Sequence, residues 1–354
     1  MRRHRNLKLL LGLFLAFIML AAACGDDSDS DSSDTTGGGG GEESLRVGLA
    51  YDLGGRGDQS FNDSAASGLD QAIEELGIEA DELEPDEGGE NREELLRLLA
   101  EDGNDLVIGV GFLYEDAITA ASADFPDTTF AIVDSVVDAD NVANLTFAEE
   151  QGSFLVGAAA ALTSETGQVG FIGGVNTELI QKFQAGFEAG VAEIDPATTV
   201  DVQYLTEPPN FDGFTDPALG KEAAASMYAD GADVVYHAAG GSGGGVFEAA
   251  SEAREGGDDV WAIGVDSDQY LTADAAVQDV ILTSMLKEVG VAVFNTIEGM
   301  VNGEDVAGIA VFDLELGGVD YSTSGDFMDQ ETIDQLEELK ASIVDGTIEV
   351  PTAP

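Results

Sequence analysis

Asp52, Phe61 and Asn62 lie in one short segment, YDLGGRGDQSFND at residues 51–63, and their side chains suit ligand binding. A carboxylate accepts hydrogen bonds, an amide donates and accepts them, and a phenyl ring offers a flat apolar face. The segment follows an apolar run at 45–51 and precedes a helical pattern at 65–76, which Ser60 or Asn62 can cap. Such a loop lies at the carboxyl edge of a parallel sheet, where these folds bind ligands. The alternative is a plain loop with a helix cap and a core phenylalanine.

Several other segments could carry catalysis, and their residues argue against it. GGSGGG at 240–245 follows an apolar run, but it fits the dinucleotide pattern G-x-G-x-x-G in no register, and there is no G-x-x-x-x-G-K-[ST] phosphate loop. His4 lies in the N-terminal segment, which leaves His237 without a second His or Cys for a zinc site. No G-x-S-x-G motif presents a nucleophile. We therefore expect no enzyme, no cofactor and no metal, and interpret His237 as a structural residue or a wall of a cleft.

The elements that position these residues alternate between strand-like and helical patterns. Strand-like runs at 45–51, 105–110, 129–133 and 142–147 alternate with helical patterns at 65–76, 92–101 and 114–123. A second alternating series follows from residue 151 to residue 265. This alternation is typical of parallel α/β sheets, and about 310 residues are enough for two lobes.

The N-terminus has the pattern of an exported, lipid-anchored protein. Arg2, Arg3, Arg5 and Lys8 precede an apolar run at 9–23, which is shorter than the ~20 residues of a membrane span. LAAAC at 20–24 resembles a lipobox, which implies cleavage before Cys24 and a diacylglyceryl group on its sulfur. Residues 25–43 contain no residue suited to a core and read as a flexible tether. The acidic run at 27–31 lacks the Gly and Glu of a calcium loop.

The chain is strongly acidic. Four of its thirteen basic residues precede residue 24, so seventy Asp and Glu then face nine Lys and Arg, a formal charge of −61. This charge repels nucleic acid and anionic lipid headgroups, so we expect no nucleic-acid partner and attachment through the lipid. The apolar fraction of 44% is ordinary, so the charge is expected on solvated faces such as residues 79–94. Adaptation to a saline habitat is one hypothesis.

YDLGGRGDQSFND resembles the N-terminal signature of the basic membrane protein family of substrate-binding lipoproteins, which is similar to purine-nucleoside-binding proteins of ABC importers. The resemblance covers nearly the whole mature chain in order. It continues through IGVGFLYEDAI (108–118), FAIVD (130–134), GSFLVGAAAAL (152–162), VGFIGG (169–174), FQAGFEAGV (183–191), DVVYHAAGGSGGGVFEAA (233–250), AIGVDSDQY (262–270) and LTSMLKEV (282–289).

The resemblance implies an α/β protein with the type I periplasmic-binding-protein fold, in which two Rossmann-like lobes with parallel sheets are joined by a hinge of three crossings. The expected divisions are a signal peptide at 1–23, a lipidated tether at 24–44, lobe 1 at 45–148 plus 270–305, and lobe 2 at 149–269 plus 306–354. The segment at 280–286 with a helix at 289–301 is expected in the first lobe. The segment at 309–314 with a helix at 331–344 is expected in the second.

The resemblance also implies a role for each matched residue. Phe61 and Phe183 are similar to the paired aromatics that sandwich the base, although Phe183 on its own pattern reads as a core residue near Phe187. Asn62 and Asp134 resemble the residues that bond the base edge. Asp52 and Asp266 resemble the acceptors of the ribose hydroxyls. Gly241 resembles a backbone contact near the sugar, and Lys287 the cation that completes the site.

One segment departs from the family pattern: EPPNFDG at 207–213 is longer and richer in proline than expected and could alter the rim of the cleft. The expected function is a monomeric protein, anchored by lipid on the extracytoplasmic face of the cell membrane. It would close on a nucleoside, expected to be a purine nucleoside, and deliver it to an ABC permease and its ATPase. The alternatives are a sugar-binding importer component and a ligand sensor that does not transport.

Overall fold

The computed structural model describes residues 44–354 apart from residue 87. The expected signal peptide, Cys24 and nearly all of the expected tether lie outside the described residues. Within the described part, no helix has the length and apolarity needed to cross a membrane.

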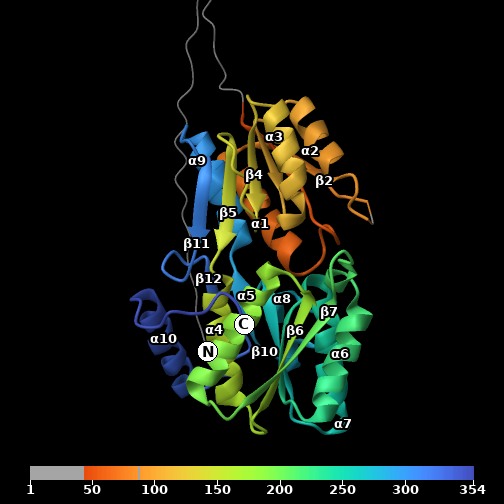
Figure 1. Cartoon of the computed structure of the whole chain (residues 1–354), viewed down its shortest axis with the longest axis vertical. Helices are drawn as coiled ribbons and strands as arrows, with labels where there is room; N and C mark the ends of the chain where they lie inside the picture. The colour runs from red at the N-terminus through yellow and green to blue at the C-terminus, as the bar shows by residue number, and fades with distance from the viewer. Residues whose placement is uncertain (1–43, 87) are drawn as a thin grey trace, which may run out of the picture. The chain divides into compact units, whose positions relative to one another are not determined.

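The first lobe is built on a sheet of six parallel strands in the order β11-β5-β4-β3-β1-β2 (Figure 1). Its helices connect successive strands, and α1 packs against α9. The strands are β1 (Arg46–Ala50), β2 (Glu79–Leu83), β3 (Leu106–Gly109), β4 (Thr129–Val133), β5 (Val142–Phe147) and β11 (Gly308–Phe312), and the helices α1 (Phe61–Leu76), α2 (Arg92–Glu101), α3 (Glu115–Asp124) and α9 (Val289–Val301).

The second lobe repeats this plan with the strand order β12-β10-β9-β8-β6-β7, in which β12 is antiparallel to β10. Helix α4 packs against α5, and α6 against α7. The strands are β6 (Gln168–Val175), β7 (Thr199–Thr206), β8 (Val234–Ala238), β9 (Trp261–Asp266), β10 (Ile281–Lys287) and β12 (Val319–Tyr321). The helices are α4 (Glu149–Thr163), α5 (Glu178–Ile194), α6 (Pro217–Asp230), α7 (Gly243–Gly256), α8 (Gln269–Thr272) and α10 (Gln330–Val344).

The chain passes between the two sheets three times, after β5, after β10 and after β11. The expected fold class, with its three crossings, is therefore confirmed. The lobes expected for two of the strands are wrong. Strand β10 pairs with β9 in the second sheet, and β11 pairs with β5 in the first. The crossing falls after Lys287 and not near residue 270, so helix α9 lies in the first lobe as expected while the strand before it does not.

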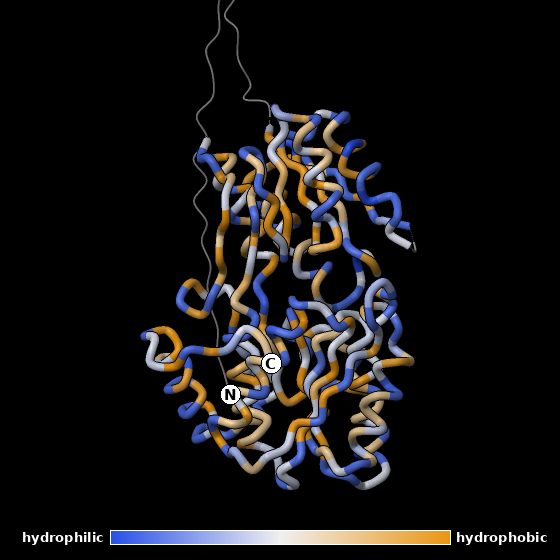
Figure 2. The backbone as a smooth tube through the Cα atoms, in the orientation of Figure 1, coloured by the Kyte–Doolittle hydropathy of each residue, from blue (hydrophilic) through white to orange (hydrophobic). Residues whose placement is uncertain are grey.

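Hydrophobic residues follow the central strands of both sheets, and hydrophilic residues gather on outer helices and loops (Figure 2). A strand covered by helices on both faces is buried on both faces, which explains the continuous apolar runs of β3, β4 and β8. Strand β2 is different, because its sequence EADEL is acidic and it pairs with β1 alone at the edge of the sheet. The acidic segment at residues 79–94, which was expected to form a solvated face, therefore includes an edge strand. Its acidic composition has no apolar pattern from which that strand could be predicted.

Close approach of α1 and α9 in the first lobe depends on two glycines. A Cβ on Gly68 would lie 2.1 Å from the carbonyl oxygen of Gly290, and one on Gly290 would lie 2.6 Å from the carbonyl oxygen of Ser64. No real Cβ fits at such distances, so a larger residue would push the helices apart. This contact fixes the start of α1, which carries Phe61 and Asn62.

Candidate functional site

A pocket of about 680 Å³, part of it open to solvent, lies between the carboxyl ends of the strands of the two sheets. All eight residues that the sequence singles out for ligand binding line it, namely Asp52, Phe61, Asn62, Asp134, Phe183, Gly241, Asp266 and Lys287. The structure therefore brings together side chains from both lobes and from segments up to 235 residues apart.

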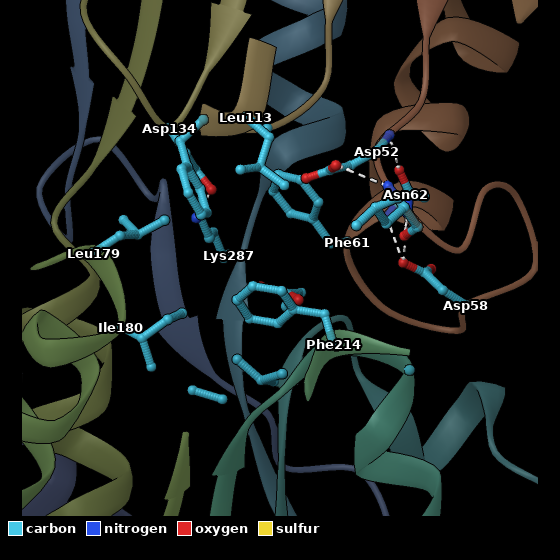
Figure 3. A pocket seen from close by; sticks show the side chains of 18 of the residues that line it. Asp52, Asp58, Phe61, Asn62, Leu113, Asp134, Leu179, Ile180, Phe214 and Lys287 are labelled. Atoms are coloured by element: carbon cyan, nitrogen blue, oxygen red, sulfur yellow. Dashed lines mark hydrogen bonds and ion pairs between the residues drawn. The ribbon is translucent and has the colours of Figure 1, made fainter. Parts of the chain in front are cut away.

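Two phenylalanines face each other across the pocket, and one of them was not expected. Phe61 at the start of α1 lies opposite Phe214, which ends a short 3-10 helix after β7 (Figure 3). Phe214 directly follows EPPNFDG (207–213), the segment that departs from the family pattern, and it lines the pocket. Phe183 also lines the pocket, but its ring is only 3% exposed within α5 and packs in the core.

Polar groups on one side of the aromatic pair surround the Lys287 ammonium (Figure 3). Its Nζ lies 2.6 Å from Asp134 Oδ2 and 3.2 Å from Glu149 Oε1. The same nitrogen lies 5.3 Å from the centre of the Phe61 ring and 5.6 Å from that of Phe183, within reach of a cation–π interaction. The side chains of Lys287 and Asp134 are 2% and 4% exposed, so this ion pair between the lobes is almost dry.

Burial sets the protonation of this group. It raises the pKa of the Asp134 carboxyl to about 7, opposed by the Lys287 ammonium and reinforced by Glu149. It also raises the pKa of Asp266 to about 6, again opposed by Lys287. Burial alone would lower the pKa of Lys287, but the carboxylates of Asp134, Glu149 and Asp266 outweigh it, so that pKa is raised and the ammonium stays charged. Asp134 Oδ1 is buried and has no hydrogen-bond partner among the described residues, which leaves it available to a ligand donor.

An unusual backbone conformation orients the side chains of Asp134 and Asp266. Asp134 follows β4 with φ of 68°, and Asp266 ends β9 with φ of 64°. The left-handed region is uncommon for residues other than glycine and costs free energy that the surrounding fold must supply. In each case it turns a carboxylate away from the strand and into the pocket.

A second polar group, formed by Asp52, Asp58 and Asn62, lies on the other side of the aromatic pair (Figure 3). Asn62 Oδ1 accepts a hydrogen bond of 2.9 Å from the Asp52 backbone N–H, and its Nδ2 donates to Leu53 O at 3.3 Å and to Asp58 Oδ2 at 3.1 Å. Both protons of the amide nitrogen are therefore used within the protein. What remains for a ligand on Asn62 is the second lone pair of its oxygen.

The cap of α1 also differs from expectation. Ser60 occupies the N-cap position, but its side chain makes no capping bond and donates instead to Asp266 Oδ2 at 2.6 Å, across the two lobes. The backbone N–H groups of Asn62 and Asp63 donate to the Asp58 carboxylate at 2.9 and 3.1 Å. The predicted caps, Ser60 and Asn62, are therefore wrong. Asp58 caps the helix because a carboxylate is also favoured at a helix N-terminus.

Further contacts join the lobes beside the pocket. The Ser267 hydroxyl donates to the Ser60 carbonyl at 3.1 Å, and Gln269 Nε2 donates to the Gln59 carbonyl at 3.2 Å. At the mouth, the rings of Phe112 and Phe211 meet edge to face with centres 6.2 Å apart. The lobes are therefore in contact around the pocket, as in the closed form of a hinged binding protein.

Sequence reasoning missed Phe214, Glu149 and Arg92. Glu149 begins α4 directly after the first crossing and is 1% exposed. Nothing in the sequence distinguishes it from the other acidic residues, of which the chain has seventy in all. Arg92 Nη2 lies 3.1 Å from Asp52 Oδ1, and it opposes the effect of burial, which raises the pKa of Asp52. The scarcity of basic residues was the signal for Arg92, since nine cations in so acidic a chain are worth placing individually.

The residues considered for catalysis lie outside the pocket lining or lack partners. His237 is fully buried on β8, its ring meets Phe247 edge to face at 5.1 Å, and burial lowers its pKa to about 3. It packs under the glycine turn, since a Cβ on Gly243 would lie 1.9 Å from His237 Cε1. Among the residues that the structure describes, no cluster of three His, Cys, Asp or Glu is arranged to hold a metal ion.

Comparison with known proteins places these features in a family. Residues 46–353 match the family model described as ABC transporter substrate-binding protein PnrA-like. The chain is 36% identical over 330 residues to the CD4+ T-cell-stimulating antigen of Listeria monocytogenes, which covers 88% of this chain and 89% of that protein. It is 35% identical over 321 residues to the ABC transporter nucleoside-binding protein BmpA of Lactococcus lactis, which covers 87% and 89%. A solved solute-binding protein of an ABC transporter from Aeropyrum pernix superposes with a TM-score of 0.77 at 29% identity, over 87% of this chain and 93% of that one.

Proposed function

We propose that this chain, which belongs to the family of PnrA-like ABC transporter substrate-binding proteins, captures a purine nucleoside between its lobes and delivers it to a membrane permease. The observation that carries the proposal is the pair Phe61 and Phe214, which face each other with polar groups on both sides (Figure 3). A nucleobase has two flat faces, and each face can stack on one ring. Polar groups on the two sides can then bind the base edge and the sugar.

The arrangement of the polar groups suggests how the ligand lies. Asp52 and Asn62 offer acceptors on one side, which suit the N–H groups of a purine edge. Asp134, Asp266 and Lys287 form the other, charged group, which suits the hydroxyls of ribose. This division pairs Asp52 with Asn62 and Asp134 with Asp266, and so exchanges the roles that the family resemblance implies for Asp52 and Asp134.

The test is calorimetry with adenosine, guanosine, inosine, uridine and their 2′- and 3′-deoxy forms. Asp266→Ala should erase discrimination between ribo and deoxy ligands. In the wild type, discrimination should be about 1–3 kcal/mol, because a missing hydroxyl leaves a buried acceptor unpaired. Asp201→Ala serves as a control, since Asp201 is exposed on β7 and lies outside the pocket lining. If no nucleoside binds while hexoses or pentoses do, the sugar-binding alternative replaces this proposal.

We also propose that Cys24 carries the membrane anchor and that the mature protein acts as a monomer on the extracytoplasmic face. The lipobox-like LAAAC supports the first part. Cys24→Ser should release soluble protein or trap the precursor, because a thioether lipid needs the sulfur. Metabolic labelling that finds no lipid on the wild-type chain would refute the anchor. Mass spectrometry of small molecules that copurify with the protein would identify the natural ligand directly.

A further inference from the structure

Four charged side chains form a continuous chain from the pocket to the surface of the second lobe. Lys182 Nζ lies 3.2 Å from Glu149 Oε2, and Glu149 Oε1 lies 3.2 Å from Lys287 Nζ. Lys287 in turn meets Asp134 at 2.6 Å. Glu149 is therefore shared by two lysines, one with a 33% exposed side chain and one almost fully buried.

The two counterions of Lys287 belong to different lobes. Asp134 follows β4 of the first sheet, whereas Glu149 begins α4, which packs against α5 and β10 of the second lobe. Lys287 ends β10 and Lys182 lies on α5, so Lys182, Glu149 and Lys287 all belong to the second lobe. Hinge opening would separate Lys287 from Asp134 and leave it with Glu149 and Asp266 of its own lobe, of which Glu149 is the one in direct ion-pair contact. A buried ammonium without a counterion is strongly disfavoured, so one partner must stay with it.

We propose that Glu149 is a positioning residue for the ligand site: it holds the Lys287 ammonium in place when the lobes are apart, so that Lys287 meets Asp134 and the ligand when they close. This inference rests on the proposed function, since it concerns the same pocket. Glu149 does not line that pocket and acts through Lys287. Its position at the first residue of α4, directly after the first crossing, ties it to the hinge.

Glu149 also sets the charge balance around the pocket. The charged and titratable groups around it are Lys182 on α5, Lys287 on β10, Asp134 after β4, Asp266 on β9, Tyr236 on β8 and Glu150 on its own helix. The negative charge of Glu149 raises the pKa of Asp134 and of Asp266. Removing that charge should lower both pKa values, and removing the Lys182 charge should raise them.

These opposite effects give the test. With the lobes closed as in the structure, carboxyl carbon NMR should show the titration of Asp134 moving to lower pH in Glu149→Gln and to higher pH in Lys182→Gln, each by about half a unit or more. Lys287 still contacts Glu149 in the second variant. Glu149→Asp should restore the wild-type midpoint, and Glu150→Gln is the matched control. A defect of folding would also lower the midpoint, because burial is what raises it, so each variant must keep the wild-type melting temperature. An unmoved midpoint, or shifts of the two variants in the same direction, would overturn the proposal whether or not a nucleoside binds.

Nucleoside affinity supplies the second readout. At pH above the titration of Asp134, Glu149→Gln should weaken adenosine or guanosine by about tenfold, the loss of one charge-assisted contact. The loss should appear mainly as slower association, because the variant no longer holds Lys287 ready in the open form. Equal association rates in wild type and Glu149→Gln would overturn the positioning role. Failure of every nucleoside to bind wild-type protein would instead overturn the proposed function.

Discussion

Phe214 should contribute more to nucleoside binding than Phe183, although the family resemblance implies that role for Phe183. Phe214 faces Phe61 across the pocket, whereas Phe183 is 3% exposed in the core of α5. Phe61→Ala and Phe214→Ala should each weaken every nucleoside by about 1–3 kcal/mol, or about five- to 150-fold, with little change in sugar preference. Phe183→Ala should chiefly destabilise the fold, by about 3–5 kcal/mol, because it leaves a cavity in the core.

Calorimetry with ribo and deoxy purines, together with thermal unfolding of each variant, separates these effects. Phe125→Ala is a matched control, since Phe125 lies at the end of α3 and outside the pocket lining. The reasoning is refuted if Phe214→Ala keeps wild-type affinity while Phe183→Ala loses tens-fold with little change in melting temperature. That result would restore the pair Phe61 and Phe183 that the family resemblance implies.

Three further outcomes follow from the charge and the packing. Affinity for ribonucleosides should fall as pH drops through about 7 and then about 6, because Asp134 and then Asp266 take up protons and no longer accept hydrogen bonds from the hydroxyls. Calorimetry at several pH values would show this fall, and a flat pH profile of the affinity would contradict it. Melting temperature should rise steeply from low to molar KCl, because salt screens the formal charge of −57, and an unchanged value would mean that the charge is well dispersed or paired. Gly68→Ala should destabilise by about 1–3 kcal/mol through its clash with Gly290, while the control Gly244→Ala, with open space at its Cβ, should not; equal thermal unfolding of the two would refute the clash.

Local pattern was enough to place most elements, and long-range pairing was not. The apolar runs at 129–133 and 142–147 and the helix at 289–301 coincide with β4, β5 and α9. Strand β2 was missed because EADEL lacks an apolar run and is stabilised by pairing with β1. The sheets of β10 and β11 were exchanged because both strands read as similar apolar segments. Strand β11 joins the first sheet because it pairs with β5, more than a hundred residues earlier in the chain. Strand β10 stays in the second sheet because the chain crosses to the first lobe only after it.

The pocket was predictable for a related reason. Asp52, Asp134 and Asp266 each follow an apolar strand, and parallel strands present their carboxyl ends at one edge of a sheet. The grouping of these residues within the pocket was not predictable, because it depends on how the two lobes face each other. Phe214 was missed for the same reason, since its loop reaches the pocket only through the position of the second lobe.

The nine basic residues of the described chain show where its charge must be balanced. Arg92 and Lys287 contact pocket carboxylates, and Lys182 reaches the pocket through Glu149, so three of the nine serve this one site. Each of the three meets a carboxylate that is 15% exposed or less. Exposed carboxylates elsewhere are solvated by water and ions and need no such partner. A buried carboxylate is costly unless a cation or hydrogen-bond donors compensate it, so a chain with few cations is expected to place several of them beside its most buried carboxylates.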